Sequence, residues 1–327
     1  MLKPLILFLL VPFATQDPRD VPDPVDLKAE TIALQPKVIT HFAIGAKGKV
    51  VYTVDKANAI RAWDIKKEEF LWETDPAPDT ATTMALAVSE KTLATCLGAP
   101  AYSLYNLKDG TSEDGASGLA TEDMTTCIAF DPKGKWIWLG GSKGGATRLT
   151  PGSINGWSTR SLENGGTLSL ALDAKAKQMA VGGKDGSVRF INPSSSKKEE
   201  ETSFEIHKSG VTAVAFGPKG KVLAVGASDG SLALIELKKG EQLQKFEGHE
   251  AAITKLAIDP KGRWLVSGDI KGNLFMWNLE DGIEPAKLGV RARGPVAGIF
   301  FLNKGATLMT TTGNQSVQVW DLSELDD

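Results

Sequence analysis

The chain has 327 residues, of which 42% are hydrophobic and 24% are charged, an ordinary composition for a globular protein. Its formal net charge is −3, so no overall positive field would draw the chain to nucleic acid or to anionic membranes. Length alone would allow two domains, and the internal pattern of the sequence has to decide between one and two.

The first 29 residues differ in composition from the rest. After a single lysine, residues 4–14 form the apolar run PLILFLLVPFA. A run of this length is too short to span a bilayer as a helix but suits a secretory signal peptide. Residues 1–14 are therefore predicted to be an export signal ending at Ala14, which places the protein in the periplasm or outside the cell. Pro12 weakens the cleavage site, so an uncleaved anchor stays open, and the proline-rich residues 15–29 predict an extended linker.

From residue 30 onward a pattern of short strands recurs. In residues 248–278, the runs ITKLAI, RWLVSG and NLFMWN are rich in β-branched and aromatic residues and are separated by turn formers. The second of these strands, with the turn before it, recurs as GAKGKVVYTVD (45–55), VSEKTLATCL (88–97), DPKGKWIWLGG (131–141), DAKAKQMAVGG (173–183), GPKGKVLAVGA (217–227), DPKGRWLVSGD (259–269) and LNKGATLMTTT (302–312).

The spacing of the repeats indicates the fold. The third strands end 42 to 44 residues apart, at Asp64, Asn106, Thr150, Asn192, Glu236, Asn278 and Asp321. This period, with four strands in each unit, is typical of a β-propeller, because one unit cannot bury both faces of its sheet without neighbours. The prediction is an all-β single domain over residues 30–327: a seven-bladed β-propeller of four-stranded antiparallel blades.

The two ends of the repeat region predict how the ring closes. The last repeat stops at Leu322, directly after its third strand, and residues 30–34 precede the first repeat. We expect residues 30–34 to pair beside residues 316–322 and to supply the missing outer strand, since an open sheet edge would invite aggregation.

Over about residues 30–322 the chain resembles the WD-repeat family. Trp63-Asp64 and Trp320-Asp321 match the closing dipeptide of that family, and Gly248-His249 matches its opening dipeptide. The resemblance implies a non-enzymatic interaction platform that binds a protein or peptide partner.

The resemblance also implies a structural hydrogen-bonded set made of an opening His, a strand Ser or Thr, a turn Asp and a closing-strand Trp. The sixth repeat offers His249, Ser267 and Trp277, but Lys271 stands where the Asp is expected. The fifth repeat offers His207 and Asp229 but has Ile235 in place of the Trp. No repeat is therefore expected to hold the complete set.

Candidates for catalysis are few. The chain has three histidines, and His207 and His249 occupy the same repeat position, which explains both structurally. His41 lies in a predicted innermost strand. No pairing of His with Cys or with another His has metal-ligand spacing, and no serine resembles a nucleophile elbow. We expect no catalytic residue, metal, cofactor, nucleic acid or membrane span, and a monomer. A cluster of His, Arg and carboxylates converging at one mouth of the central channel would favour the alternative, a propeller enzyme or cofactor-binding protein.

Two cysteines, Cys96 and Cys127, are too few for a disulfide framework. Buried free thiols are favoured, and a disulfide between neighbouring blades stays open.

Basic residues mark the turns between first and second strands, which a propeller places on one face. They are Lys47, Lys49, Lys91, Lys133, Lys135, Lys175, Lys177, Lys219, Lys221, Lys261, Arg263 and Lys304. A polar turn repeated by duplication is the favoured explanation, and a site for an anionic polymer or lipid is the alternative.

The opposite face is the predicted partner site, because WD-repeat proteins often bind partners where the innermost strands begin. The corresponding residues, here called the mouth positions, are Thr40, Met84, Thr126, Leu168, Thr212, Thr254 and Ala297. The loop positions beside them include Lys56, Lys143, Lys184, Asp185, Asp229 and Lys271. The prediction is a neutral mouth surrounded by mixed charge.

Overall fold

The computed structural model describes most of the repeat region. The described residues are 27, 29–33, 38–45, 48–75, 84–88, 92–97, 102–113, 123–131, 134–150, 157–195, 202–279, 286–288, 294–312 and 316–325. The predicted export signal and nearly all of the predicted linker lie outside them.

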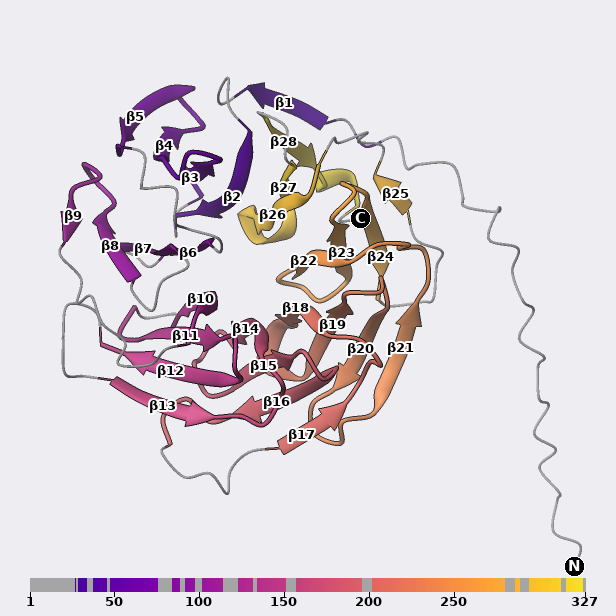
Figure 1. The fold of residues 1–327 in the computed structure, drawn as a ribbon. Helices are drawn as coiled ribbons and strands as arrows, with labels where there is room; N and C mark the ends of the chain where they lie inside the picture. Colours follow the sequence, from indigo (N-terminus) through magenta and orange to yellow (C-terminus); the bar gives the residue numbers. More distant parts are fainter. Residues whose placement is uncertain are drawn as a thin grey trace, which may run out of the picture.

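The described strands form seven four-stranded antiparallel sheets arranged around a central axis (Figure 1). The first three sheets are β2 (Ile39–Ile44), β3 (Val50–Asp55), β4 (Ile60–Asp64) and β5 (Glu69–Glu73); β6 (Met84–Val88), β7 (Thr92–Leu97), β8 (Tyr102–Asn106) and β9 (Ser112–Glu113); and β10 (Thr125–Phe130), β11 (Ile137–Gly141), β12 (Gly145–Leu149) and β13 (Trp157–Ser161).

The next three sheets are β14 (Thr167–Leu172), β15 (Met179–Gly183), β16 (Ser187–Ile191) and β17 (Thr202–Glu205); β18 (Val211–Phe216), β19 (Val222–Ala227), β20 (Leu232–Glu236) and β21 (Gln242–Phe246); and β22 (Ile253–Ile258), β23 (Trp264–Asp269), β24 (Leu274–Asn278) and β25 (Ala286–Leu288). The prediction of an all-β propeller with four-stranded antiparallel blades is confirmed.

The last sheet joins the two ends of the described chain. It consists of β26 (Val296–Leu302), β27 (Thr307–Thr312), β28 (Ser316–Asp321) and β1 (Ala29–Ala33). β1 is antiparallel to β28, with Ala29 opposite Trp320 and Ala33 opposite Ser316. Ile32 packs with Val317 and Met309, so the N-terminal strand also contributes to a buried cluster. The predicted outer strand therefore pairs as expected.

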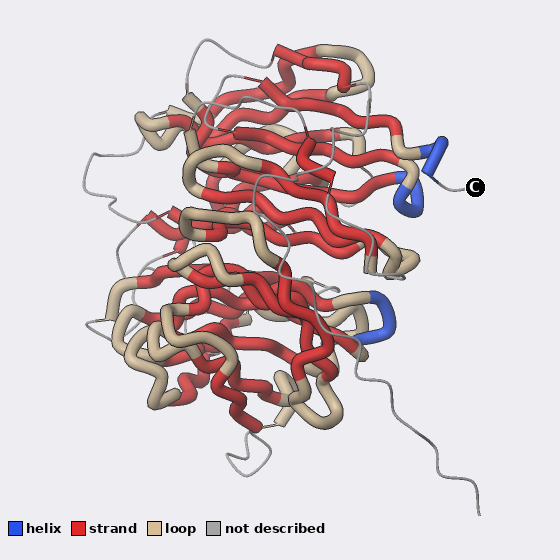
Figure 2. Tube along the Cα trace, turned by 90° about the vertical axis from the view of Figure 1, so that its right-hand side faces the viewer, coloured by secondary structure: helices blue, strands red, loops and turns tan. Residues whose placement is uncertain are grey.

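Turns project from two opposite faces of the ring (Figure 2). Three single-turn 3-10 helices in the described part of the chain, Pro218–Gly220, Asn303–Gly305 and Ser323–Leu325, lie on one of these faces. Two of them form turns between first and second strands. This arrangement follows from the strand directions, which place all such turns on one face and the starts of the innermost strands on the other.

Neighbouring sheets pack face to face through apolar side chains. Between the fifth and sixth sheets, for example, Leu232 and Phe246 pack with Ile253 and Leu265, and all four are buried. The sheets approach closely near the axis, where four second strands carry a glycine, namely Gly140, Gly182, Gly226 and Gly268. A Cβ atom on Gly226 would lie 2.7 Å from Cγ2 of Ile253, so this approach requires glycine.

Candidate functional site

The mouth positions coincide with a repeated irregularity in the innermost strands. In six of the described innermost strands the pairing with the second strand skips one residue, as in a β-bulge. The skipped residues are Thr40, Thr126, Leu168, Thr212, Thr254 and Ala297. Met84 begins β6, and its side chain lies outside the described part of the structure.

The threonines among the mouth positions are engaged in structural hydrogen bonds. The Thr212 hydroxyl donates to the Ile253 carbonyl of the next sheet at 2.6 Å. The Thr254 hydroxyl lies 2.8 Å from the Val296 carbonyl in the same relation, and Thr126 bonds the Thr167 carbonyl. Because each hydroxyl links one innermost strand to the next, these residues stabilise the ring as well as lining its opening.

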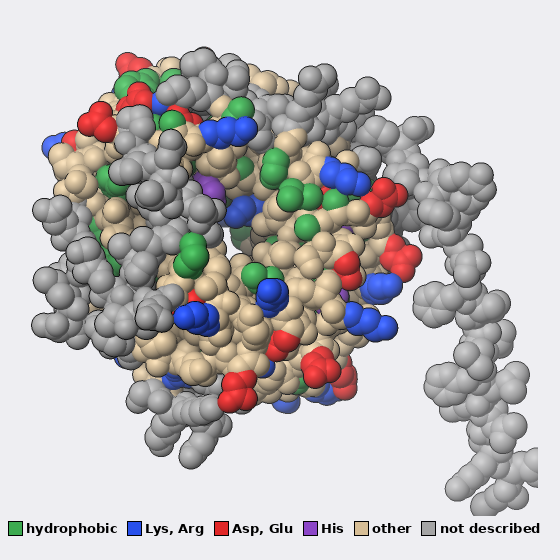
Figure 3. All heavy atoms as spheres, in the orientation of Figure 1, with side chains coloured by type: hydrophobic (Ala, Val, Ile, Leu, Met, Phe, Trp, Pro, Cys, Tyr) green, Lys and Arg blue, Asp and Glu red, His purple; other side chains and the backbone are tan. Residues whose placement is uncertain are grey.

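The innermost strands enclose a central cavity of about 270 Å³. Five mouth positions line it, Thr126, Leu168, Thr212, Thr254 and Ala297, together with the residues that follow them. Seen down the axis, hydrophobic side chains and those of Lys and Arg gather around the opening, and acidic side chains lie mainly toward the rim (Figure 3). The uncharged mouth positions are therefore only part of the surface at the opening, which also includes charged and hydrophobic side chains.

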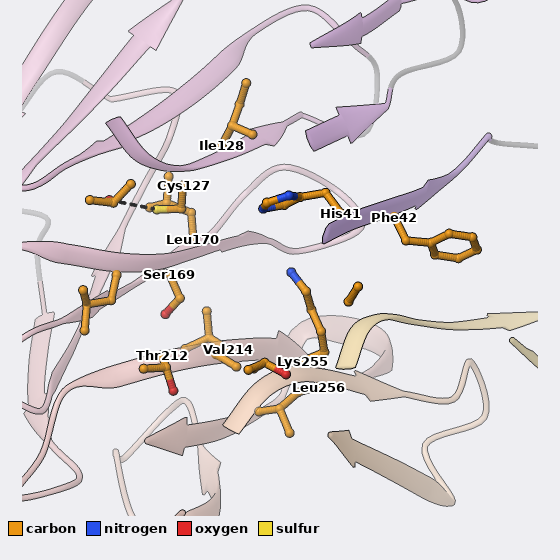
Figure 4. Close-up of a pocket in the computed structure, with 15 residues that line it drawn as sticks. His41, Phe42, Cys127, Ile128, Ser169, Leu170, Thr212, Val214, Lys255 and Leu256 are labelled. Carbon is orange, nitrogen blue, oxygen red and sulfur yellow. Dashed lines mark hydrogen bonds between the residues drawn. The ribbon is translucent and has the colours of Figure 1, made fainter. Parts of the chain in front are cut away.

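The side chains directly after the bulges give the cavity its chemistry. Lys255 extends its ammonium group into the channel, and His41 points inward from β2 (Figure 4). Cys127 and Ser169 lie at the same level on β10 and β14. Neither Lys255 nor His41 was predicted to face the channel. The available signal was that each is an ionisable residue inside an otherwise uncharged strand.

The environment of Lys255 disfavours its charge. The side chain is exposed to the channel, and the crowding of protein atoms around it lowers the pKa of its ammonium group. Burial also raises the pKa of the nearby Cys127 thiol to about 12, so Cys127 is neutral at pH 7. Cys96 is fully buried, and both cysteines are free thiols, as favoured from the sequence.

The loop positions around the mouth are exposed and carry both signs of charge. They are Lys56, Lys143, Lys184, Asp185, Asp229 and Lys271. Asp185 pairs with Arg189 at 3.2 Å, and its pKa is lowered because hydrogen bonds from Ser187 outweigh the opposing effect of burial. On the same face Met124 is 41% exposed and Ile270 51% exposed, which adds apolar contact surface beside the charges.

The opposite, basic face has a structural explanation in its turns. A buried aspartate ends several first strands and accepts backbone N–H groups from the turn that follows. Asp259 accepts from Arg263 at 2.6 Å and from Trp264 at 2.8 Å, and Asp173 accepts from Lys177 and Gln178 in the same way. Of the predicted basic ring, Lys47, Lys91 and Lys133 lie outside the described residues.

The sixth repeat contains a complete hydrogen-bonded set, so the expectation that no repeat would hold one is wrong. The Trp277 indole donates to the Ser267 hydroxyl at 2.8 Å, and Nε2 of His249 lies 2.7 Å from the same oxygen. The acid is Asp269, whose Oδ2 is 3.0 Å from Nδ1 of His249. Asp269 ends β23, two residues before the position expected from the family pattern, and its side chain reaches back across the turn.

The other closing dipeptides are structural as well. The Trp320 indole donates to the Thr310 hydroxyl at 3.0 Å, repeating the contact between Trp277 and Ser267. Trp63 packs edge-on against Phe70, with ring centroids 5.3 Å apart. Asp64 and Asp321 each accept backbone N–H groups from the residues that follow, which fixes the turn after the third strand.

Two functional features are absent from the described part of the chain. No group of three or more His, Cys, Asp or Glu residues there could hold a metal ion. The helices found there are too short to cross a membrane.

Two family models match the chain. One describes the WD40 domain of anaphase-promoting complex subunit 4 and matches residues 201–257, and the other describes the WD domain, G-beta repeat, and matches residues 240–278. No curated protein shows significant similarity to the chain. The second match covers β21 to β24, which hold the set formed by His249, Ser267, Asp269 and Trp277. With the propeller architecture, these matches, which lie within residues 201–278, support a place for the chain in the WD-repeat β-propeller family.

Proposed function

We propose that the protein is a non-enzymatic platform that binds a protein or peptide partner through the mouth face of a closed, seven-bladed ring. The supporting observation is the composition of that face. Exposed Lys184, Asp229 and Lys271 carry mixed charge there, and exposed Met124 and Ile270 add apolar area. Mixed polar and apolar surface, with methionine enriched, is typical of protein interfaces.

The proposed setting is outside the cytoplasm, with the protein acting as a monomer. Support for export comes from the apolar run at residues 4–14, which has the length of a signal-peptide core.

The test compares variants of the two faces. A tagged protein would be used to capture partners from the exported fraction of the native host. The mouth variant combines Lys184→Glu, Asp229→Lys and Lys271→Glu, and the control combines Lys175→Glu, Lys219→Glu and Lys261→Glu on the opposite face. These side chains are preferable to Thr212 and Thr254, whose hydroxyls join neighbouring sheets.

The proposal expects a partner that the wild type and the control retain and that the mouth variant loses. A partner lost only by the control variant would overturn it and would favour an anionic ligand at the basic turns. Circular dichroism would establish that both variants are folded.

A further inference from the structure

The central channel contains a positive charge without a negative partner in the described structure. Lys255 projects into the cavity from β22, directly after the bulge at Thr254 (Figure 4). No ion pair joins Lys255 to any residue that the structure describes. Its side chain is exposed to the channel, so a ligand that enters the cavity can reach the ammonium group.

The innermost strands supply no such opposite charge. The residues of β2, β6, β10, β14, β18, β22 and β26 include one lysine, one histidine and no aspartate or glutamate. Among the side chains lining the cavity, the Cys127 thiol is neutral at pH 7. The described innermost strands therefore present a lysine and no acidic side chain to the channel.

The hydroxyl groups around Lys255 are already used as donors. Ser169 donates to the Val211 carbonyl at 3.0 Å, and Thr212 and Thr254 donate to carbonyls of the next sheets. The Lys255 ammonium group is thus the lysine or arginine charge on the described cavity wall, and the His41 imidazole lies on the same wall. A single charge suits a monovalent acid better than a phosphate, which usually requires several donors or an arginine fork.

Apolar residues form part of the wall, beside hydroxyl groups, and the space is small. Ile128, Leu170, Val214 and Leu256 line the cavity beside Lys255 (Figure 4). A volume of about 270 Å³ accommodates one acidic side chain or chain end but not a folded domain.

We propose that the channel is a binding site for a carboxylate group that forms an ion pair with Lys255. The partner of the platform would present this group, as an acidic side chain or as a C-terminal carboxylate. The identity of the donor rests on the proposed function, but the site itself does not, because small acids can test it alone.

The experiment measures binding of defined probes by ligand-observed NMR. The acids are propionate, acetyl-Gly-Glu-Gly-amide and acetyl-Gly-Gly-Gly with a free C-terminus. The neutral control is acetyl-Gly-Gln-Gly-amide. Inorganic phosphate tests whether the site binds any negative charge and does not distinguish a carboxylate. We expect the carboxylates to bind the wild type, Lys255→Met to weaken their binding at least tenfold, and Lys175→Met, on the opposite face, to leave it within twofold. The tightest of the three identifies the source of the carboxylate.

A second measurement does not depend on a variant. Labelling of wild-type lysines with an amine-reactive ester, read by mass spectrometry, should show Lys255 protected by the glutamate peptide and exposed Lys271 unprotected.

Three results would overturn the carboxylate site: equal binding by Lys255→Met, phosphate bound as tightly as the acids, or no protection of Lys255. If these results appeared while the mouth variant still lost its partner, the platform would stand without the carboxylate site.

Discussion

Replacing Asp269 with asparagine tests how much its carboxylate contributes to the hydrogen-bonded set of the sixth repeat. Its Oδ1 accepts the backbone N–H groups of Lys271 and Asn273, both at 2.9 Å. Its Oδ2 accepts from the Asn273 amide at 2.7 Å and faces Nδ1 of His249 at 3.0 Å. A neutral His249 with its proton on Nδ1 satisfies all of these atoms and leaves Nε2 to accept from Ser267.

The asparagine retains an oxygen for the turn but places an amide N–H₂ where Oδ2 stood. Two donors, from His249 and Asn273, would then face a third donor inside the protein. Each buried polar group left without its partner costs about 1–3 kcal/mol, and hydrogen bonds to a charged acceptor are among the stronger ones. Rearrangement of the histidine tautomer would recover part of this cost. We expect Asp269→Asn to lower the free energy of unfolding by about 2–4 kcal/mol.

Urea unfolding followed by circular dichroism measures this loss, with Asp229→Asn as the matched control. Asp229 occupies a turn in the fifth repeat, where it accepts the Ser231 N–H at 2.9 Å, but it is exposed. An amide oxygen can replace that acceptor, so the control should stay within about 0.5 kcal/mol of the wild type. If the two variants lost equal stability, the reasoning about the buried set would be refuted.

Four further predictions concern stability and processing. Hydrogen bonds from Asn273 and His249 outweigh burial and lower the pKa of Asp269. The ionised carboxylate therefore stabilises the fold above about pH 4, and this stabilisation is lost as the pH falls through the pKa of the folded state. Acid titration should destabilise the wild type more than Asp269→Asn. A chain starting at residue 38 lacks β1 and should lose about 3 kcal/mol by urea unfolding, chiefly from Ile32 burial and strand pairing, whereas one starting at residue 27 should match the wild type. Gly226→Ala should cost about 1–3 kcal/mol in the same assay, because its Cβ would collide with Ile253, and an unchanged midpoint would contradict the close approach of the sheets. Mass spectrometry of protein from the native host should find an N-terminus near Thr15 or Gln16, and an intact Met1 in a cytoplasmic fraction would remove the export proposal.

The sequence was sufficient to predict the blades because their determinants are local. Each strand is a short apolar run between turn formers, and the regular period requires the runs to stack. The pairing of β1 with β28 was also predictable, since the last repeat lacked an outer strand and residues 30–34 had no other assigned place.

The chemistry of the channel and of the sixth repeat was harder to predict. Lys255 and His41 face the axis because a bulge inserts one residue at the start of β22 and of β2. A one-residue shift changes which side chains of a strand face inward. The bulge has no sequence signature of its own. Asp269 was missed because the family pattern places the acid within the turn, whereas here the end of the strand supplies it.

The seam between β1 and β28 also constrains the order of folding. Among the described strands β1 is synthesised first and its partner β28 last, so β1 cannot pair until the intervening sheets have been made. The entropy of closing so long a loop grows only with the logarithm of its length, which keeps the thermodynamic cost modest. The kinetic consequence is larger, because contacts this distant in sequence form slowly. Until the seam forms, the outer edge of β28 lacks its partner strand, and an unpaired strand edge can pair with a second chain.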